Sequence, residues 1–163
     1  MLQNLGWLAM IAGDYADSQA FTEESLALRQ KVVHTFGLAW SLTQRGYLAW
    51  HRGEFPAARA ALNQGLALFK QMEASSFNTC PCVTGLAAVD VSEGRLARGV
   101  SLLGAIAAES GRTGRTNKDI FLRVYDKTLD AARAQMDPGA FEAAWAAGRA
   151  LTMAQATELA SQS

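Results

Sequence analysis

Apolar and small residues return every three or four positions along most of the chain, and short polar turns interrupt them. Clear examples are residues 18–28, 58–68 and 98–108. This period brings the apolar side chains to one face of an α-helix, so we predict an amphipathic helix for each run. No segment has a convincing strand pattern, and the sequence therefore predicts an all-α protein.

Each of these runs follows a segment that itself recurs along the chain. Residues 5–15 and 45–55 share a glycine, an aromatic residue, a leucine, an alanine, a glycine, an acid and an aromatic residue in the same order, 40 residues apart. A weaker third copy covers residues 86–96. The unit is a helix, a tight turn at glycine, a second helix and a loop. Because one pair cannot bury both its faces, three stacked pairs predict a right-handed helical solenoid.

The first helix of each unit carries a small residue, which is Gly6, Gly46 or Ala87. A small side chain there is expected to let the second helix of the pair approach closely. The third copy differs from the first two, because Asp90 stands where an apolar residue is expected and Gly99 replaces an alanine. We therefore expect the third pair to pack less regularly.

These positions carry a resemblance to a known family. The order of residues 5–15, continued by Ser18 and Ser25, resembles the tetratricopeptide repeat. The second copy fits the same template at Gly46, Ala49, Gly53, Phe55, Ala58 and Gly65. The resemblance implies an all-α, tetratricopeptide-like scaffold that binds other molecules on the concave face lined by the first helices.

A second resemblance concerns the kind of protein. A period of 40 residues, in place of about 34, resembles a subgroup with longer helices in bacterial LuxR-type regulators and related signal-transduction ATPases. Residues 97–105 and 141–152 look like the closing segment of those regulators. The chain also opens inside a helix without a preceding cap. Together these features imply the C-terminal helical module of a longer regulatory protein, with its ATPase, kinase or DNA-binding domain elsewhere.

We divide the chain accordingly. Three helix pairs are predicted at about residues 1–34, 37–72 and 79–110, a polar connector at 111–117, and closing helices at 118–163.

Local signals place the closing helices. Thr116 or Asn117 is predicted to cap a helix that ends near Gln135, and Asp137 followed by proline to begin another. Residues 152–155 have the form of a capping box for a last helix ending near residue 160. The total is nine helices.

The net charge of the chain argues against some classes of binding partner. The chain has 15 Lys and Arg against 15 Asp and Glu, for a formal charge of +0. Sequence-independent binding to nucleic acid or to an anionic membrane draws on a surplus of basic side chains, so we expect neither partner. No apolar run reaches the roughly 18 to 20 residues of a membrane span. The first basic residue is Arg29, so no signal peptide is indicated and we expect a cytoplasmic protein.

Candidate chemistry is sparse. Cys80 and Cys82 are two residues apart, but a tetrahedral metal site needs four ligands and the chain has only His34 and His51 besides. We interpret the cysteines as free structural thiols and His34 as a solvated helix end. Residues 111–116 lack the strand and the lysine of a phosphate-binding loop. No constellation of cysteine, serine and carboxylate surrounds His51 at a spacing that would support catalysis, so we predict no enzyme, no cofactor and no metal.

A candidate binding surface remains. Spacings of three and four residues along the first helices of the pairs mark it. Its residues are Trp7, Met10, Ile11, Trp40, Thr43, Tyr47, Trp50, His51, Thr84 and Ala88. Those of the second pair are expected on the side opposite Gly46, and Trp7 and Tyr47, 40 residues apart, are expected to be neighbours.

Two interpretations of this surface stay open. An exposed aromatic stripe would mark a binding site. Alternatively, closing helices fold back and make the stripe ordinary core; the aromatic residues that would cover it are Phe121, Tyr125, Phe141 and Trp145. The leading functional hypothesis is an interaction and sensing module that binds a protein, a peptide or a neighbouring domain. The alternatives are a small-molecule effector pocket closed by the C-terminal helices, and a structural spacer. The sequence predicts no oligomeric state.

Overall fold

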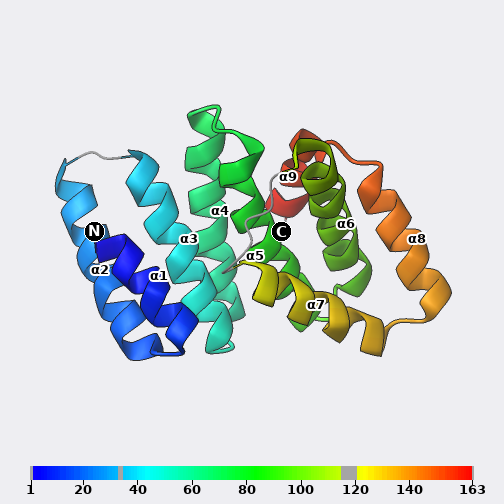
Figure 1. The fold of residues 1–163 in the computed structure, drawn as a ribbon, viewed down its shortest axis with the longest axis horizontal. Coiled ribbons are helices and arrows are strands. Elements are labelled where there is room, and N and C mark those ends of the chain that lie inside the picture. Colours follow the sequence, from blue (N-terminus) through cyan, green and yellow to red (C-terminus); the bar gives the residue numbers. More distant parts are fainter. Residues whose placement is uncertain (1, 33–34, 115–120, 163) are drawn as a thin grey trace. The chain divides into compact units, whose positions relative to one another are not determined.

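The computed structural model describes residues 2–32, 35–114 and 121–162 (Figure 1). These ranges hold nine α-helices and no strand. The helices are α1 (Leu2–Ala12), α2 (Tyr15–Val32), α3 (Thr35–His51), α4 (Phe55–Gln71), α5 (Ser76–Ser92), α6 (Leu96–Thr113), α7 (Phe121–Gln135), α8 (Pro138–Arg149) and α9 (Met153–Ser161). The prediction of an all-α, tetratricopeptide-like helical repeat is confirmed.

The chain divides into two compact units, Met1–Ala74 and Ser75–Ser163. The first unit holds α1 to α4, and the second holds α5 to α9. The boundary falls between the second and third predicted helix pairs.

Glycine makes the tight turn inside each helix pair. Gly13, Gly53 and Gly94 have φ angles of 89°, 76° and 81°, a left-handed conformation that side chains with a Cβ avoid. Nothing lies within 4 Å of a Cβ built at any of the three. The backbone conformation, rather than crowding, therefore requires glycine there, as the repeat predicts.

Small residues also allow close helix packing in the first unit. A Cβ at Gly46 would lie 2.9 Å from Cδ2 of Leu62 on α4, so α3 and α4 approach as predicted. At Gly6 the neighbour differs from the prediction. Its missing side chain makes room for the side chain of Gln44, which belongs to α3 rather than to the paired helix α2. The residue packs against the next pair because a repeat buries its second face there.

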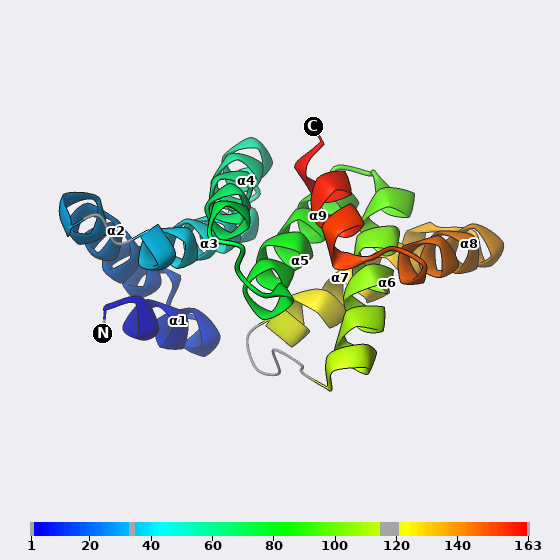
Figure 2. The same ribbon diagram turned by 90° about the horizontal axis from the view of Figure 1, so that it is seen from above.

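In the second unit, α5 packs against α6, α7 and α9, and α8 lies alongside α6 (Figure 2). Close approach of α5 and α6 occurs at Gly99, where a Cβ would lie 2.6 Å from Cγ2 of Val91 and 3.0 Å from the carbonyl oxygen of Ala87. The alanine that the repeat pattern expects at position 99 would not fit without a shift.

Two predicted caps of the closing helices are present. The Asp137 side chain accepts hydrogen bonds from the N–H groups of Gly139 and Ala140 at 2.9 and 3.2 Å, with Pro138 in the first turn. Thr152 and Gln155 form the reciprocal capping box at the start of α9. Both predictions are confirmed.

The predicted connector needs a correction at its start. Helix α6 continues to Thr113 and ends at Gly114, whose φ is 64°. The first three residues of the proposed 111–117 connector are therefore helical. The expected cap at Thr116 or Asn117 lies outside the described residues.

Candidate protein-interaction site

The residues of the predicted surface differ widely in burial. In the first unit, four of these residues are buried, three are partly exposed and one is exposed. The buried residues are Trp7, Met10, Thr43 and Tyr47, the partly exposed ones are Ile11, Trp40 and Trp50, and the exposed one is His51. In the second unit, Thr84 and Ala88 are both buried.

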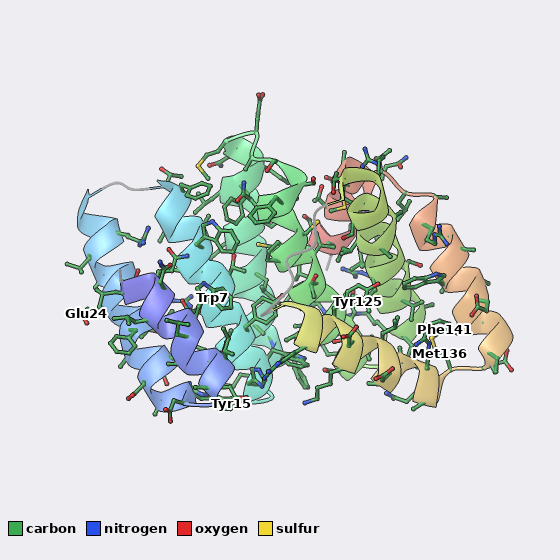
Figure 3. All side chains as sticks on the ribbon, viewed as in Figure 1. Trp7, Tyr15, Glu24, Tyr125, Met136 and Phe141 are labelled. Carbon is green, nitrogen blue, oxygen red and sulfur yellow. The ribbon has the colours of Figure 1, made fainter. Side chains whose placement is uncertain are left out.

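Trp7 and Tyr47 are in contact, as their 40-residue separation predicts. Their ring centroids are 5.9 Å apart with an interplanar angle of 66°, an edge-to-face arrangement favoured by aromatic quadrupoles. Tyr47 has no exposed surface. Figure 3 labels Trp7 on α1. This pair stabilises the packing of α1 on α3 and belongs to the core of the first unit.

Thr43 does not lie on the side opposite Gly46. Its hydroxyl donates to the carbonyl oxygen of Ala39 at 2.8 Å, and its Oγ1 lies 3.0 Å from where a Cβ on Gly65 of α4 would be. The prediction was wrong because positions 43 and 46 are three apart and share a helix face. Trp40 also packs toward α4, with its ring centroid 5.5 Å from that of Phe69.

The exposed part of the set gathers at the end of α3. The Tyr15 ring at the start of α2 lies 4.6 Å from the His51 ring, tilted by 39°. The ring of the preceding residue, Trp50, has its centroid 5.0 Å from that of the His51 ring, with an interplanar angle of 63°. Tyr15 is 40% exposed, His51 is exposed and Trp50 is partly exposed. We call Tyr15, Trp50 and His51 the aromatic patch; Figure 3 labels Tyr15.

Sequence reasoning missed Tyr15. It occupies the repeat position of Phe55, directly after the turn, and enters the sequence analysis only as part of the repeat pattern. The order of helices in the repeat could have pointed to it. Successive helices run antiparallel, so the first residue of α2 is expected near the last residue of α3. His51 is the last residue of α3 and Tyr15 is the first of α2.

The second unit contains a buried ionic cluster. Asp90 has no exposed surface, and its carboxylate lies 3.0 Å from Nε of Arg95 and 3.1 Å from Nε of Arg98. Arg98 also donates to the carbonyl oxygens of Ala160 and Gln162 at the end of α9. These charges are directed at each other and at the backbone, so the cluster is structural.

Aromatic residues of the closing helices pack within the second unit. The Tyr125 hydroxyl donates to the carbonyl oxygen of Leu103 at 3.2 Å. The Phe141 and Trp145 rings stack with centroids 6.3 Å apart, and the Arg133 guanidinium lies 5.1 Å from the Phe141 ring. The Phe121 side chain lies outside what the structure describes.

Groups suited to catalysis or metal binding are few. In the described ranges no cluster of three or more His, Cys, Asp or Glu could hold a metal ion. Neither Cys80 nor Cys82 forms a disulfide, and burial raises the pKa of Cys80 to about 11. A thiol with this pKa stays protonated near neutrality and is a poor nucleophile and ligand. His34 lies outside the described residues.

Comparison with known proteins identifies the first unit. Residues 1–71 match the tetratricopeptide repeat family. The match covers α1 to α4, so the first unit is a tetratricopeptide-like module. Tetratricopeptide repeats generally mediate protein–protein interaction and are typically not enzymes. The comparison with curated proteins found no match, and neither did the comparison with solved structures.

None of the helices that the structure describes has the length and apolar character needed to cross a membrane.

Proposed function

We propose that the chain is a non-catalytic interaction module of a larger bacterial regulatory protein, and that its tetratricopeptide-like unit binds a protein or peptide through the aromatic patch. The observation that carries this proposal is the cluster of Tyr15, Trp50 and His51, whose rings lie together and keep exposed surface. Aromatic side chains bury a large area with few rotamers to freeze, and they dominate the energy of many interfaces.

The surroundings of the patch support a protein partner. Asp14, Arg52 and Glu54 are exposed beside it in the sequence, and Arg52 donates to the Gln19 side chain. An apolar centre with a charged rim is the usual anatomy of a protein interface. Ile11, in the last turn of α1, keeps partial exposure and is included in the proposed surface.

The other residues of the predicted surface have a supporting role in this proposal. Trp7, Met10 and Tyr47 are buried and hold α1 against α3. Trp40 and Thr43 face α4. They position the helix that ends in Trp50 and His51.

The proposed regulatory context rests on the resemblance to LuxR-type regulators and signal-transduction ATPases. The same resemblance implies a cytoplasmic protein. A partner bound to this module would change the activity of other domains only if it prefers one arrangement of the larger protein.

A peptide-display selection tests the binding face. The full chain is used to select peptides from a random library, and the affinity of each is measured for the Tyr15→Ala and His51→Ala variants. We expect a loss of about tenfold or more, the scale of an interface hot spot, with little change in melting temperature because both side chains are exposed.

Phe36→Ala is the matched control. Phe36 is an exposed aromatic residue (44%) at the opposite end of α3, packed against Phe69. Its variant should bind the selected peptides as the parent chain does. Equal losses for all three variants, or none for any, would contradict the proposal. So would stabilisation by a metabolite that no longer occurs with His51→Ala, since this would favour the effector-pocket alternative.

A further inference from the structure

The turns that lead into α2 and α4 each carry an acid next to the aromatic patch. Asp14 directly precedes Tyr15, and Glu54 follows His51 by three residues. The N–H of each acid donates at 2.9 Å to an alanine carbonyl oxygen in the last turn of the preceding helix, so the two turns have the same hydrogen bond one repeat apart. Both acids are exposed. Carboxylates therefore occupy equivalent places on the two turns that border the rings.

Acids outnumber bases around the patch. In the two turns and the first turn of α2, the acids Asp14, Asp17 and Glu54 stand against one arginine, Arg52. The Arg52 side chain is directed at α2, where it donates to Gln19. Glu54 is the N-cap residue of α4, yet its side chain makes no capping hydrogen bond. The charge beside the rings is therefore negative, and the Glu54 carboxylate is not used to cap its own helix.

The spacing of the rings suits a cation. The faces of aromatic rings are electron-rich, and a cation within about 6 Å of a ring centroid is attracted to the ring. The centroids of Tyr15 and His51 are 4.6 Å apart, and those of Trp50 and His51 are 5.0 Å apart. Both separations are shorter than this range, so one cation can lie close to more than one ring. The interplanar angles of 39° and 63° turn the ring faces in different directions.

We infer that the aromatic patch receives an arginine or lysine side chain of a peptide segment of the partner. The cation lies over the rings of Tyr15 and Trp50, and the carboxylates of Asp14 and Glu54 attract it. This inference names the partner chemistry of the proposed function and rests on it. An acidic segment is disfavoured at the same place, because it would meet like charges and the negative faces of the rings.

The exposed aromatic residue at the opposite end of α3 lacks this charge. Phe36 is 44% exposed and packs against Phe69. No Asp or Glu occurs in residues 25–53, a range that contains Phe36 and ends just before Glu54. The preference for a cation is therefore expected at the Tyr15 end of the first unit and not at the Phe36 end.

The peptides selected from the random library with the full chain are the probe. Those that lose affinity with Tyr15→Ala should contain arginine or lysine more often than the unselected library does. In the tightest of them each arginine is replaced in turn by citrulline, which keeps the shape of arginine without its charge, and each lysine by acetyl-lysine. At pH 8, where an ordinary histidine is neutral, one such replacement should lower the affinity about tenfold.

A matched pair of variants places the cation beside Glu54. Glu54→Gln removes one charge and should lower the affinity for the cationic peptide about threefold, with no effect on the neutral form of that peptide. Glu24→Gln is the control. Glu24 is an exposed acid on α2, nine residues beyond Tyr15, and Figure 3 labels both. Its variant should bind both peptides as the parent chain does.

Some outcomes would overturn this inference and leave the proposed function standing. One is a tightest peptide that depends on Tyr15 but contains no arginine or lysine. Others are equal affinities of the cationic and neutral peptides, and equal losses for Glu54→Gln and Glu24→Gln. A selection that yields no peptide dependent on Tyr15 would overturn both, because the patch would then not be a binding site.

Discussion

Nε of Arg98 lies 3.1 Å from Oδ2 of Asp90, a carboxylate with no exposed surface. The pair joins α6 to α5, and the same arginine reaches the Ala160 carbonyl oxygen on α9 at 3.2 Å. The sequence pattern expects an apolar residue at position 90. The acid is tolerated because two arginines and the backbone satisfy the charges around it.

Replacing Asp90 with alanine should destabilise the protein by roughly 3 kcal/mol, the lower range for breaking a buried ion pair, because Arg95 keeps contact with solvent. Asp130→Ala is the matched control, since Asp130 is 78% exposed and pairs with Arg133 at only 3.8 Å. It should cost less than about 1 kcal/mol. Urea unfolding measures both values. Similar losses would contradict the structural role of the Asp90 cluster.

Gly148→Ala should disrupt the contact between α8 and α6. A Cβ at Gly148 would overlap the carbonyl group of Ser101 and lie 2.7 Å from its Cα. Backbone atoms cannot move aside as a side chain does, so we expect a loss of about 2 kcal/mol or more. Gly111→Ala should instead stabilise by about 0.5 kcal/mol, because nothing lies within 4 Å of its Cβ position on α6. Thermal unfolding that ranks the two variants the other way would refute the close contact.

Tyr125 should make stability fall at alkaline pH. Burial raises the pKa of Tyr125 to about 12, the Asp126 carboxylate adds to the rise and Arg133 opposes it. The unfolded chain has a tyrosine pKa near 10. The neutral form is therefore favoured in the folded state, and the stability that it contributes is complete below about pH 10 and is lost as the pH rises to about 12.

The Tyr125→Phe variant isolates this effect. It should lose about 1 kcal/mol near neutral pH with the hydrogen bond to Leu103. Above about pH 10 the difference from the parent chain should shrink, because only the parent has this group to ionise. The free energy of unfolding is measured for both chains between pH 7 and 11. Parallel curves would show that the environment of Tyr125 does not favour its neutral form.

Cys80 should react slowly with iodoacetamide in the folded protein. Burial raises its pKa to about 11, so little thiolate is present at pH 8. The neighbouring Cys82 is fully buried and should be slower still. Mass spectrometry of alkylated peptides gives both rates, with urea-unfolded protein as the control in which both thiols react. Rapid alkylation of folded Cys80 at pH 8 would contradict the buried environment.

Local signals in the sequence predicted local structure well. The capping box of Thr152 and Gln155 and the cap at Asp137 involve residues two or three apart, so no distant part of the chain needs to be known. The repeat also predicted a contact across helix pairs, between Trp7 and Tyr47. Repetition supplies this long-range information because equivalent residues occupy equivalent places in neighbouring units.

The candidate site was harder to predict. Periodicity assigns a residue to a helix face but does not say what covers that face. Thr43 was placed on the wrong side for a different reason: it lies three residues from Gly46, which puts both on the helix face that packs against α4. Tyr15 was overlooked because its position in the repeat explained it already. The exposed cluster of Tyr15, Trp50 and His51 depends on which side chains stay uncovered where the start of α2 meets the end of α3, and only the structure describes that.

The most direct test of the interaction proposal is a map of amide chemical shifts of the full chain as the tightest selected peptide is added. The proposal predicts that the largest changes cluster at Tyr15, Trp50 and His51, and that His51→Ala removes them without changing the rest of the spectrum. Largest changes that fall elsewhere, and that persist in the His51→Ala variant, would contradict it.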